Sequence, residues 1–231
     1  MKGDFSLSNI PQSAKLGQHV VIEENVNIGK NVVIGHHTTI LAGTKIGDHV
    51  TIGSQCVLGI QPGGSARMRK TSKRDMELVI EEGSRIGHVT SIYAGTKLGK
   101  NVFVGDHASI RENVSVEEES VVGRASIVEL NTKIGKGCTI QTLAYVTGDT
   151  TLEDDVFIGP CVSMSNDKYM GAQAFSLNGP YIKQGAKIGN NASLLPGITI
   201  GQNTIIGAGA VVTKDMEDNI TAAGIPARKI K

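Results

Sequence analysis

The stretch IGKNVVIGHHTTILAGTKIGDHVTIG, residues 28–53, decides the fold, because an aliphatic side chain returns in it at every sixth position. The same series runs over residues 16–58, 80–164 and 182–212, and every member is Ile, Leu, Val or Met. Apolar residues make up only 39% of the chain, so chance does not produce such a series. The chain is therefore predicted to be a coil of six-residue repeats.

The other positions of each repeat predict its geometry. The fourth residue after the aliphatic one is usually Val, Thr, Ser, Ala or Cys, and the third is mostly Asn, Gly, Asp or His. The latter residues tolerate a positive φ, so each repeat is expected to be a short strand followed by a tight bend. Three repeats would close a triangular turn of about 18 residues, and stacked turns would form parallel sheets on three faces.

This repeat resembles that of the hexapeptide-repeat acyltransferases. The resemblance implies an all-β, left-handed parallel β-helix, whereas parallel crossovers in general are right-handed. We expect about ten turns with two loop excursions and a short C-terminal tail, and a height of roughly 45–50 Å at a strand spacing of about 4.8 Å.

The unbroken repeat predicts a single β-helix domain over residues 1–231. Its expected parts are N-terminal turns (10–60), a basic loop (61–79), central turns (80–164), a substrate loop (165–181), C-terminal turns (182–216) and a tail (217–231). The formal charge of +1 gives no electrostatic basis for binding nucleic acid or an anionic membrane. Three cysteines and the lack of a long apolar run favour a cytoplasmic protein.

The two interruptions of the repeat are the places where substrate specificity is expected, because loops on a uniform scaffold usually carry it. The first follows a glycine-rich opening with basic residues, which fit either a solvated loop or a clamp on phosphate oxygens. The second contains a tyrosine near its start. The candidate substrate-binding residues are Arg67, Arg69, Lys70 and Tyr169.

The last repeats and the tail segment GIPAR, residues 224–228, resemble the coenzyme A end of the same acyltransferases. The resemblance implies acetyl-CoA as co-substrate and a homotrimer with active sites in the grooves between columns. Small residues would leave room for pantetheine, and a basic residue would meet phosphate. The candidate coenzyme contacts are Ala192, Gly209, Ala210, Lys214, Pro226 and Arg228. The structural alternative is a polar cap, which any repeat protein needs at its end.

The stretch LEDDVFIGP (152–160), followed by VSMSND (162–167), is similar to the segment before the substrate loop of bacterial nucleotide-aminosugar N-acetyltransferases. The resemblance covers roughly residues 134–231. It implies that Asn166 lies at the acceptor sugar, and Glu129 falls where the family often has an acid. Where the family commonly has His, this chain has Ala125, which leaves the acceptor open.

The positions of the histidines bear on the acceptor. If the adenosine end of the coenzyme lies near Lys214 and Arg228, an extended pantetheine spans about four turns, on the order of 20 Å. Counted back from Arg228 without the second excursion, this places the thioester near residues 134–146. None of the six histidines follows His107. A hydroxyl acceptor must lose its proton during attack, usually to a His, whereas a neutral amine is already nucleophilic. An amine is therefore the expected acceptor.

We thus expect an acetyl-CoA-dependent N-acetyltransferase that acts on the amino group of a nucleotide-linked amino sugar. Asn166 would position the amine or the carbonyl, Glu129 or Asp167 would receive the proton, and backbone N–H groups would stabilise the oxyanion. His107 is the remaining candidate base.

Two alternatives stay open, a sugar O-acetyltransferase with His107 or His88 as its base and a non-enzymatic β-helix scaffold. His19 and His37, one turn apart, are too few for a metal site, so no metal is expected.

Overall fold

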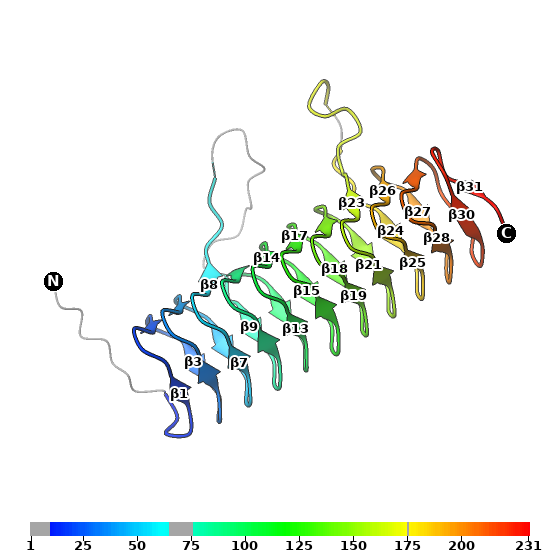
Figure 1. Cartoon of the computed structure of the whole chain (residues 1–231). Helices are drawn as coiled ribbons and strands as arrows, with labels where there is room; N and C mark the ends of the chain where they lie inside the picture. Colours follow the sequence, from blue (N-terminus) through cyan, green and yellow to red (C-terminus); the bar gives the residue numbers. More distant parts are fainter. Residues whose placement is uncertain (1–9, 65–75, 175) are drawn as a thin grey trace.

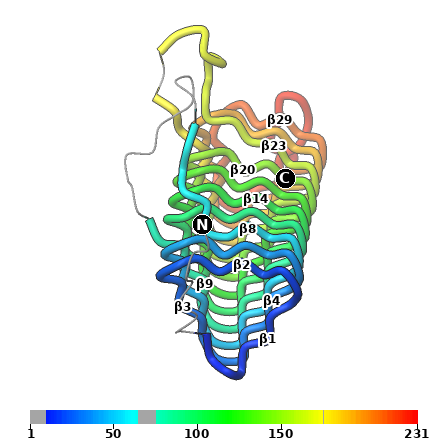
Figure 2. The backbone as a smooth tube through the Cα atoms, turned by 90° about the vertical axis from the view of Figure 1, so that its left-hand side faces the viewer, coloured from blue at the N-terminus to red at the C-terminus, as the bar shows by residue number. Residues whose placement is uncertain are grey.

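The computed structural model describes residues 10–64, 76–174 and 176–231. Within these ranges every regular element is a β-strand, mostly of two residues, and the strands form a coil whose turns stack along one axis (Figures 1 and 2). No helix long and apolar enough to span a membrane occurs in the described parts. The expected left-handed parallel β-helix is confirmed. The predicted contacts Arg67, Arg69 and Lys70 lie outside the described residues.

Consecutive strands belong in turn to three sheets, here named A, B and C. Sheet A contains β1 (Lys15–Leu16), β4 (Val33–Ile34), β7 (Thr51–Ile52), β10 (Arg85–Ile86), β13 (Phe103–Val104), β16 (Val121–Val122), β19 (Thr139–Ile140), β22 (Phe157–Ile158), β25 (Lys187–Ile188), β28 (Ile205–Ile206), β30 (Thr221–Ala223) and β31 (Arg228–Lys229). Sheet B contains β2 (Val21–Ile22), β5 (Thr39–Ile40), β8 (Val57–Ile60), β11 (Ser91–Tyr93), β14 (Ser109–Ile110), β17 (Ile127–Val128), β20 (Tyr145–Val146), β23 (Ser163–Met164), β26 (Ser193–Leu194) and β29 (Val211–Val212). Sheet C contains β3 (Asn27–Ile28), β6 (Lys45–Ile46), β9 (Val79–Ile80), β12 (Lys97–Leu98), β15 (Ser115–Val116), β18 (Lys133–Ile134), β21 (Thr151–Leu152), β24 (Tyr181–Ile182) and β27 (Thr199–Ile200).

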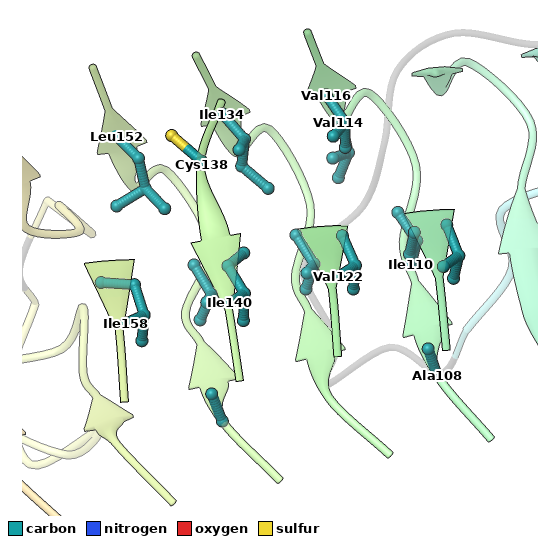
Figure 3. Packing of buried hydrophobic residues seen from close by; sticks show 14 of the residues in the cluster. Ala108, Ile110, Val114, Val116, Val122, Ile134, Cys138, Ile140, Leu152 and Ile158 are labelled. Carbon is teal, nitrogen blue, oxygen red and sulfur yellow. The ribbon is translucent and has the colours of Figure 1, made fainter. Parts of the chain in front are cut away.

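The core is built from the aliphatic residue of each repeat. The side chains of Leu152, Ile134 and Val116 follow one another along sheet C and face those of sheet A (Figure 3). Small residues such as Ala108 and Cys138 fill the space beside them. Burial raises the pKa of the Cys138 thiol to about 11, as befits a residue that packs rather than reacts.

Bends between strands carry the left-handed residues that the repeat predicts. We call the bend from sheet A to sheet B the AB bend, the next one the BC bend, and one level of the stack a rung. Asn31 and His37 have φ values of 57° and 56°. The AB bends also hold apolar residues in this conformation, among them Val89 (φ 56°) and Leu143 (φ 62°), which the repeat does not predict.

Both excursions leave the column at a BC bend. The first lies between β8 and β9, and the second lies between β23 and β24 (Figure 1). The sequence spacing of the second, 164 to 182, equals about one turn of the repeat, but the chain makes no extra turn there. Ile182 instead pairs with Leu152 in the next sheet. Both excursions therefore rise from the same edge of the column.

The tail closes the C-terminal end of the column. Strand β30 extends sheet A in parallel, and β31 turns back against it in antiparallel pairing. The tail also reaches sheet B, because the Ala227 N–H donates to the Val211 carbonyl at 2.8 Å and the Val211 N–H donates to the Gly224 carbonyl at 3.1 Å. The last strand of sheet B is thus flanked by the tail.

Candidate functional site

A cluster of charged and aromatic side chains lies on the BC edge between the two excursions. Tyr93, Arg111 and Glu129 each occupy the first position after the aliphatic residue of their repeat, on the successive rungs of β11, β14 and β17. Glu112 follows Arg111, and Tyr145 stands on β20, the next rung. We call these five residues the edge cluster.

Arg111 and Glu112 form a buried ion pair. The Arg111 Nε and Nη2 atoms donate to the two Glu112 oxygens at 2.9 and 3.2 Å. The side chain of Glu112 is only 1% exposed and that of Arg111 16%. Burial alone would lower the pKa of Arg111, but its hydrogen bonds to Glu112 and the charges of Glu112 and Glu129 outweigh burial and raise it. The raised pKa keeps Arg111 charged, and removal of the Glu112 carboxylate would take away the charge that compensates this largely buried cation.

The remaining edge of the Arg111 guanidinium faces Glu129. Arg111 Nη1 lies 3.7 Å from Glu129 Oε2, which is an ionic contact but too long for a hydrogen bond. Within the described residues, no hydrogen bond reaches the Glu129 carboxylate, and its side chain is 22% exposed. Glu129 is thus held beside a cation while its oxygens remain open to a ligand.

Two tyrosines border this arrangement. The Arg111 guanidinium carbon lies 4.9 Å from the centre of the Tyr93 ring, within cation–π range. Burial, followed by the neighbouring charge of Glu129, raises the pKa of Tyr145. Tyr145 is therefore a neutral phenol beside Glu129 at physiological pH.

A β-bulge at the root of the first excursion orients Tyr93. Strand β8 is lengthened to Ile60, and its register with β11 shifts between Ile92 and Tyr93, so that Tyr93 pairs with Ile60. Gly59 makes this possible with a φ of 90°, and a Cβ there would lie 2.4 Å from Thr44 Oγ1. Bulges commonly re-aim a side chain next to a functional site, as this one does for Tyr93.

Asn166 and Asp167 lie on the same edge, at the root of the second excursion. Asn166 Nδ2 donates to the Gly148 carbonyl at 3.3 Å. Its amide therefore points toward the rung of β20, which lies between the rungs of β23 and β17. The Asp167 oxygens accept hydrogen bonds from the N–H groups of Tyr169 and Gly171, both at 2.8 Å. Asp167 thus shapes the loop that carries Tyr169, and Glu129 is the more open of the two predicted proton acceptors.

The structure brings only some of the predicted catalytic residues together. Glu129 and Asn166 are two rungs apart on one edge, about 10 Å at the usual strand spacing. His107 lies at an AB bend, on the other edge of sheet B, and His88 lies at the AB bend one rung below. The Nδ1 atom of His88 accepts a hydrogen bond from the Ser54 N–H at 2.9 Å. Neither histidine belongs to the edge cluster of its own chain.

The predicted coenzyme contacts fall into two groups. Gly209, Lys214, Pro226 and Arg228 are exposed around the C-terminal end of sheet B and on the tail. Ala192 and Ala210 are fully buried among core residues, so their side chains are not exposed in the described chain. They occupy the small inward position of the repeat, and only neighbouring core atoms reach their methyl groups.

Sequence reasoning missed Arg111, Glu112, Tyr93 and Tyr145 as site residues. The signal was a spacing of about one full turn, which stacks Tyr93, Arg111 and Glu129 on one edge. Within the described residues, no group of three or more His, Cys, Asp or Glu side chains is arranged to hold a metal ion.

A family model matches two parts of the chain. Residues 25–59 and 179–214 match the family model "Bacterial transferase hexapeptide (six repeats)". This match confirms the resemblance to the hexapeptide-repeat transferases that the sequence repeat indicates.

Individual relatives match only short parts of the chain. Galactoside O-acetyltransferase of Escherichia coli (strain K12) is 52% identical over 44 residues, which are 19% of this chain and 22% of that protein. The enzyme of the same name from Lactococcus lactis is 48% identical over 46 residues, 20% of this chain and 22% of that protein. The chain thus spans less than a quarter of the length of these curated relatives.

Comparison with solved structures gives matches of low sequence identity. PerB from Caulobacter crescentus, in complex with CoA and GDP-perosamine, is 22% identical, with a TM-score of 0.36 over 63% of this chain and 59% of that chain. A hexapeptide-repeat acetyltransferase from Vibrio cholerae, complexed with acetyl coenzyme A, is 24% identical, with a TM-score of 0.44 over 55% of this chain and 70% of that chain.

Proposed function

We propose that the protein transfers an acetyl group from acetyl-CoA to the amino group of a nucleotide-linked amino sugar. The observation that carries the proposal is a rung count along sheet B. Lys214 follows β29, and Glu129 follows β17, four rungs away. Four rungs measure on the order of 20 Å, the reach of an extended pantetheine arm. A coenzyme anchored at Lys214 would therefore present its thioester to the edge cluster.

The path between these two points supports the placement of the coenzyme. Ser163 and Ser193 are the outward residues of β23 and β26, and their small side chains leave room along the face of sheet B. Lys214 and Arg228 are exposed cations at the end of this path, where they suit phosphate oxygens. Gly209 and Pro226 flank it on the side of the tail.

The charges of the edge cluster support an amine as the acceptor. Arg111 is one cation shared by two carboxylates, so these three side chains carry a surplus negative charge that suits an ammonium group. After the amine loses its extra proton, its nitrogen attacks the thioester carbonyl. The C–N bond forms and the C–S bond breaks, while the proton of the attacking nitrogen passes through Glu129 to the departing thiolate.

Asn166, two rungs from Glu129, would orient the acceptor with its side-chain amide. Tyr169 would contact the sugar from the second excursion. Arg67, Arg69 and Lys70 of the first excursion remain the candidates for binding the diphosphate. Both excursions rise from the BC edge that carries the edge cluster, which supports a shared role in acceptor binding.

A homotrimer in the reducing cytoplasm completes the proposal. The side chains of Val89 and Leu143 are 39% and 57% exposed at AB bends, and Ala125 and Cys161 occupy the same position on the rungs on either side of Leu143, while His107 lies between Ala125 and Val89. An apolar strip in a left-handed backbone is better explained by contact with another column than by exposure to water. All three cysteines are free, as a reducing compartment requires.

Sugar O-acetylation is the second candidate, because short segments of the chain are 52% and 48% identical to galactoside O-acetyltransferases. In a trimer, an AB edge could approach the BC edge of a neighbouring column and bring His107 to the site. That histidine would then act as the base for a hydroxyl acceptor.

A paired assay separates the two candidates. UDP-, GDP- and dTDP-linked amino sugars and their hydroxy counterparts are incubated with acetyl-CoA, thiol release is followed, and products are tested for the base lability of an ester. We expect a base-stable amide. Glu129→Gln should lower kcat about 100-fold, the usual contribution of a proton acceptor, while His107→Ala leaves kcat unchanged. An ester product together with loss of activity in His107→Ala would establish O-acetylation instead.

A further inference from the structure

We infer that Arg111 is a positioning residue of the proposed reaction, because it holds Glu129 in place through charge while leaving both carboxylate oxygens open to the acceptor. The inference rests on the proposed function and adds a residue that no sequence motif of this chain identifies. It follows from the contacts of the Arg111 guanidinium group with Glu112, Tyr93 and Glu129.

The Arg111 guanidinium is held along one edge and on one face. Its Nε and Nη2 atoms are engaged by the buried Glu112, and its face lies against Tyr93. The backbone is also tied down, because the Arg111 N–H donates to the Val128 carbonyl at 2.9 Å and Thr96 Oγ1 donates to the Arg111 carbonyl at 2.7 Å. The third nitrogen, Nη1, is the one that lies toward Glu129.

The separation of 3.7 Å between Arg111 Nη1 and Glu129 Oε2 is functionally informative. In the ion pairs Lys45–Glu77 and Lys136–Glu118, the lysine Nζ lies 2.6 Å from a glutamate oxygen, and each of these side chains is about half exposed. Those carboxylates accept a strong hydrogen bond from their lysine. Glu129 instead gains the attraction of a fixed cation without a hydrogen bond, so its lone pairs stay available for the proton of a substrate N–H.

A double-mutant cycle on kcat tests this role. The four proteins are the wild type, Arg111→Lys, Glu129→Gln and the double variant. Lysine keeps a charge beside Glu112 but lacks the planar fork that presents Nη1 to Glu129. We expect Arg111→Lys to lower kcat roughly 10–100-fold, with an unchanged KM for acetyl-CoA. The double variant should be no slower than Glu129→Gln alone.

The inference would be overturned if Arg111→Lys lowered kcat by the same factor in the wild type and in Glu129→Gln. An arginine with a merely structural role would have the same effect in both proteins. Arg85→Lys, an exposed arginine on sheet A, is the matched control and should leave kcat unchanged. If Arg111→Lys does not fold, the paired variant Arg111→Gln, Glu112→Gln removes both buried charges and enters the same cycle.

The outcomes distinguish this inference from the proposed function. The cycle is run on whichever acceptor the wild type acetylates. A hydroxyl acceptor with a non-additive cycle would refute the proposed function and keep the role of Arg111. An amine acceptor with an additive cycle would support the proposed function and refute the role of Arg111. An unchanged kcat in Glu129→Gln, or no transfer to either acceptor, would refute the inference with its premise.

Discussion

At the scale of single residues, Leu143 is the clearest departure from the rules of the repeat. Its backbone is left-handed, with a φ of 62°, and more than half of its side chain is exposed. Asn, Gly, Asp or His occupy the equivalent bend in most repeats, because an L-residue with a large side chain pays about 1–2 kcal/mol in this conformation. The sequence period predicts the bend but not an apolar residue in it.

Replacing Leu143 by Asn should therefore have two opposite effects. The melting temperature of the isolated chain should rise, since the strain of about 1 kcal/mol is relieved. Self-association should weaken, because the apolar strip of the AB edge is interrupted. Thermal denaturation over a dilution series and sedimentation velocity measure both quantities. Asn203→Leu, at a bend of another edge with a φ of 53°, is the control that should lower the melting temperature and leave association unchanged.

The residues of the edge cluster could be predicted from the sequence only in part. Glu129 and Asn166 could be singled out through resemblance to a family, and both lie on the edge from which the excursions rise. Arg111 and Glu112 could not, because nothing in the repeat says that a bend can enclose a carboxylate with 1% exposure. That burial depends on how the folded chain packs around the pair, which the repeat does not encode.

At the scale of the strand and its bend, close stacking fixes where glycine is required. A Cβ on Gly105 would lie 2.6 Å from the backbone nitrogen of Arg124, one rung above. A Cβ on Gly209 would have no atom within 4 Å, although its φ of 68° is left-handed. The two glycines are therefore needed for different reasons, the first for space and the second for conformation.

The variants Gly105→Ala and Gly209→Ala form a matched pair. Gly105→Ala should destabilise the protein by about 3 kcal/mol, since a rung must move. Gly209→Ala should cost only about 1 kcal/mol. Melting curves followed by circular dichroism measure the difference. Equal melting temperatures would mean that backbone contact between rungs does not limit the stack.

The elements themselves were predictable almost throughout. The period of six gave each two-residue strand and each bend, because the buried aliphatic residue and the left-handed residue recur with it. The excursions were predicted from the interruptions of the repeat. That both leave the same edge of the column was not predicted, since the spacing from 164 to 182 equals that of a full turn. Pairing of Ile182 with Leu152 resolves that ambiguity.

At the scale of the whole molecule, the proposed function requires the coenzyme to span the four rungs between Lys214 and Glu129. Lys214→Ala should weaken the binding of coenzyme A about fivefold, as expected for one exposed charge on a phosphate. Binding of acetyl-pantetheine, which lacks the nucleotide, should be unaffected. Calorimetry with both ligands measures the effect, and equal losses for the two would show that Lys214 does not meet the nucleotide end.

The shared origin of the two excursions at the BC bend has an evolutionary consequence. Each insert begins and ends at one bend, so its length does not disturb the pairing above or below it. The entropy of closing a loop also grows only slowly with its length. Natural recombination can therefore exchange either insert as a cassette, and acceptor preference in such proteins can diversify while the scaffold stays the same.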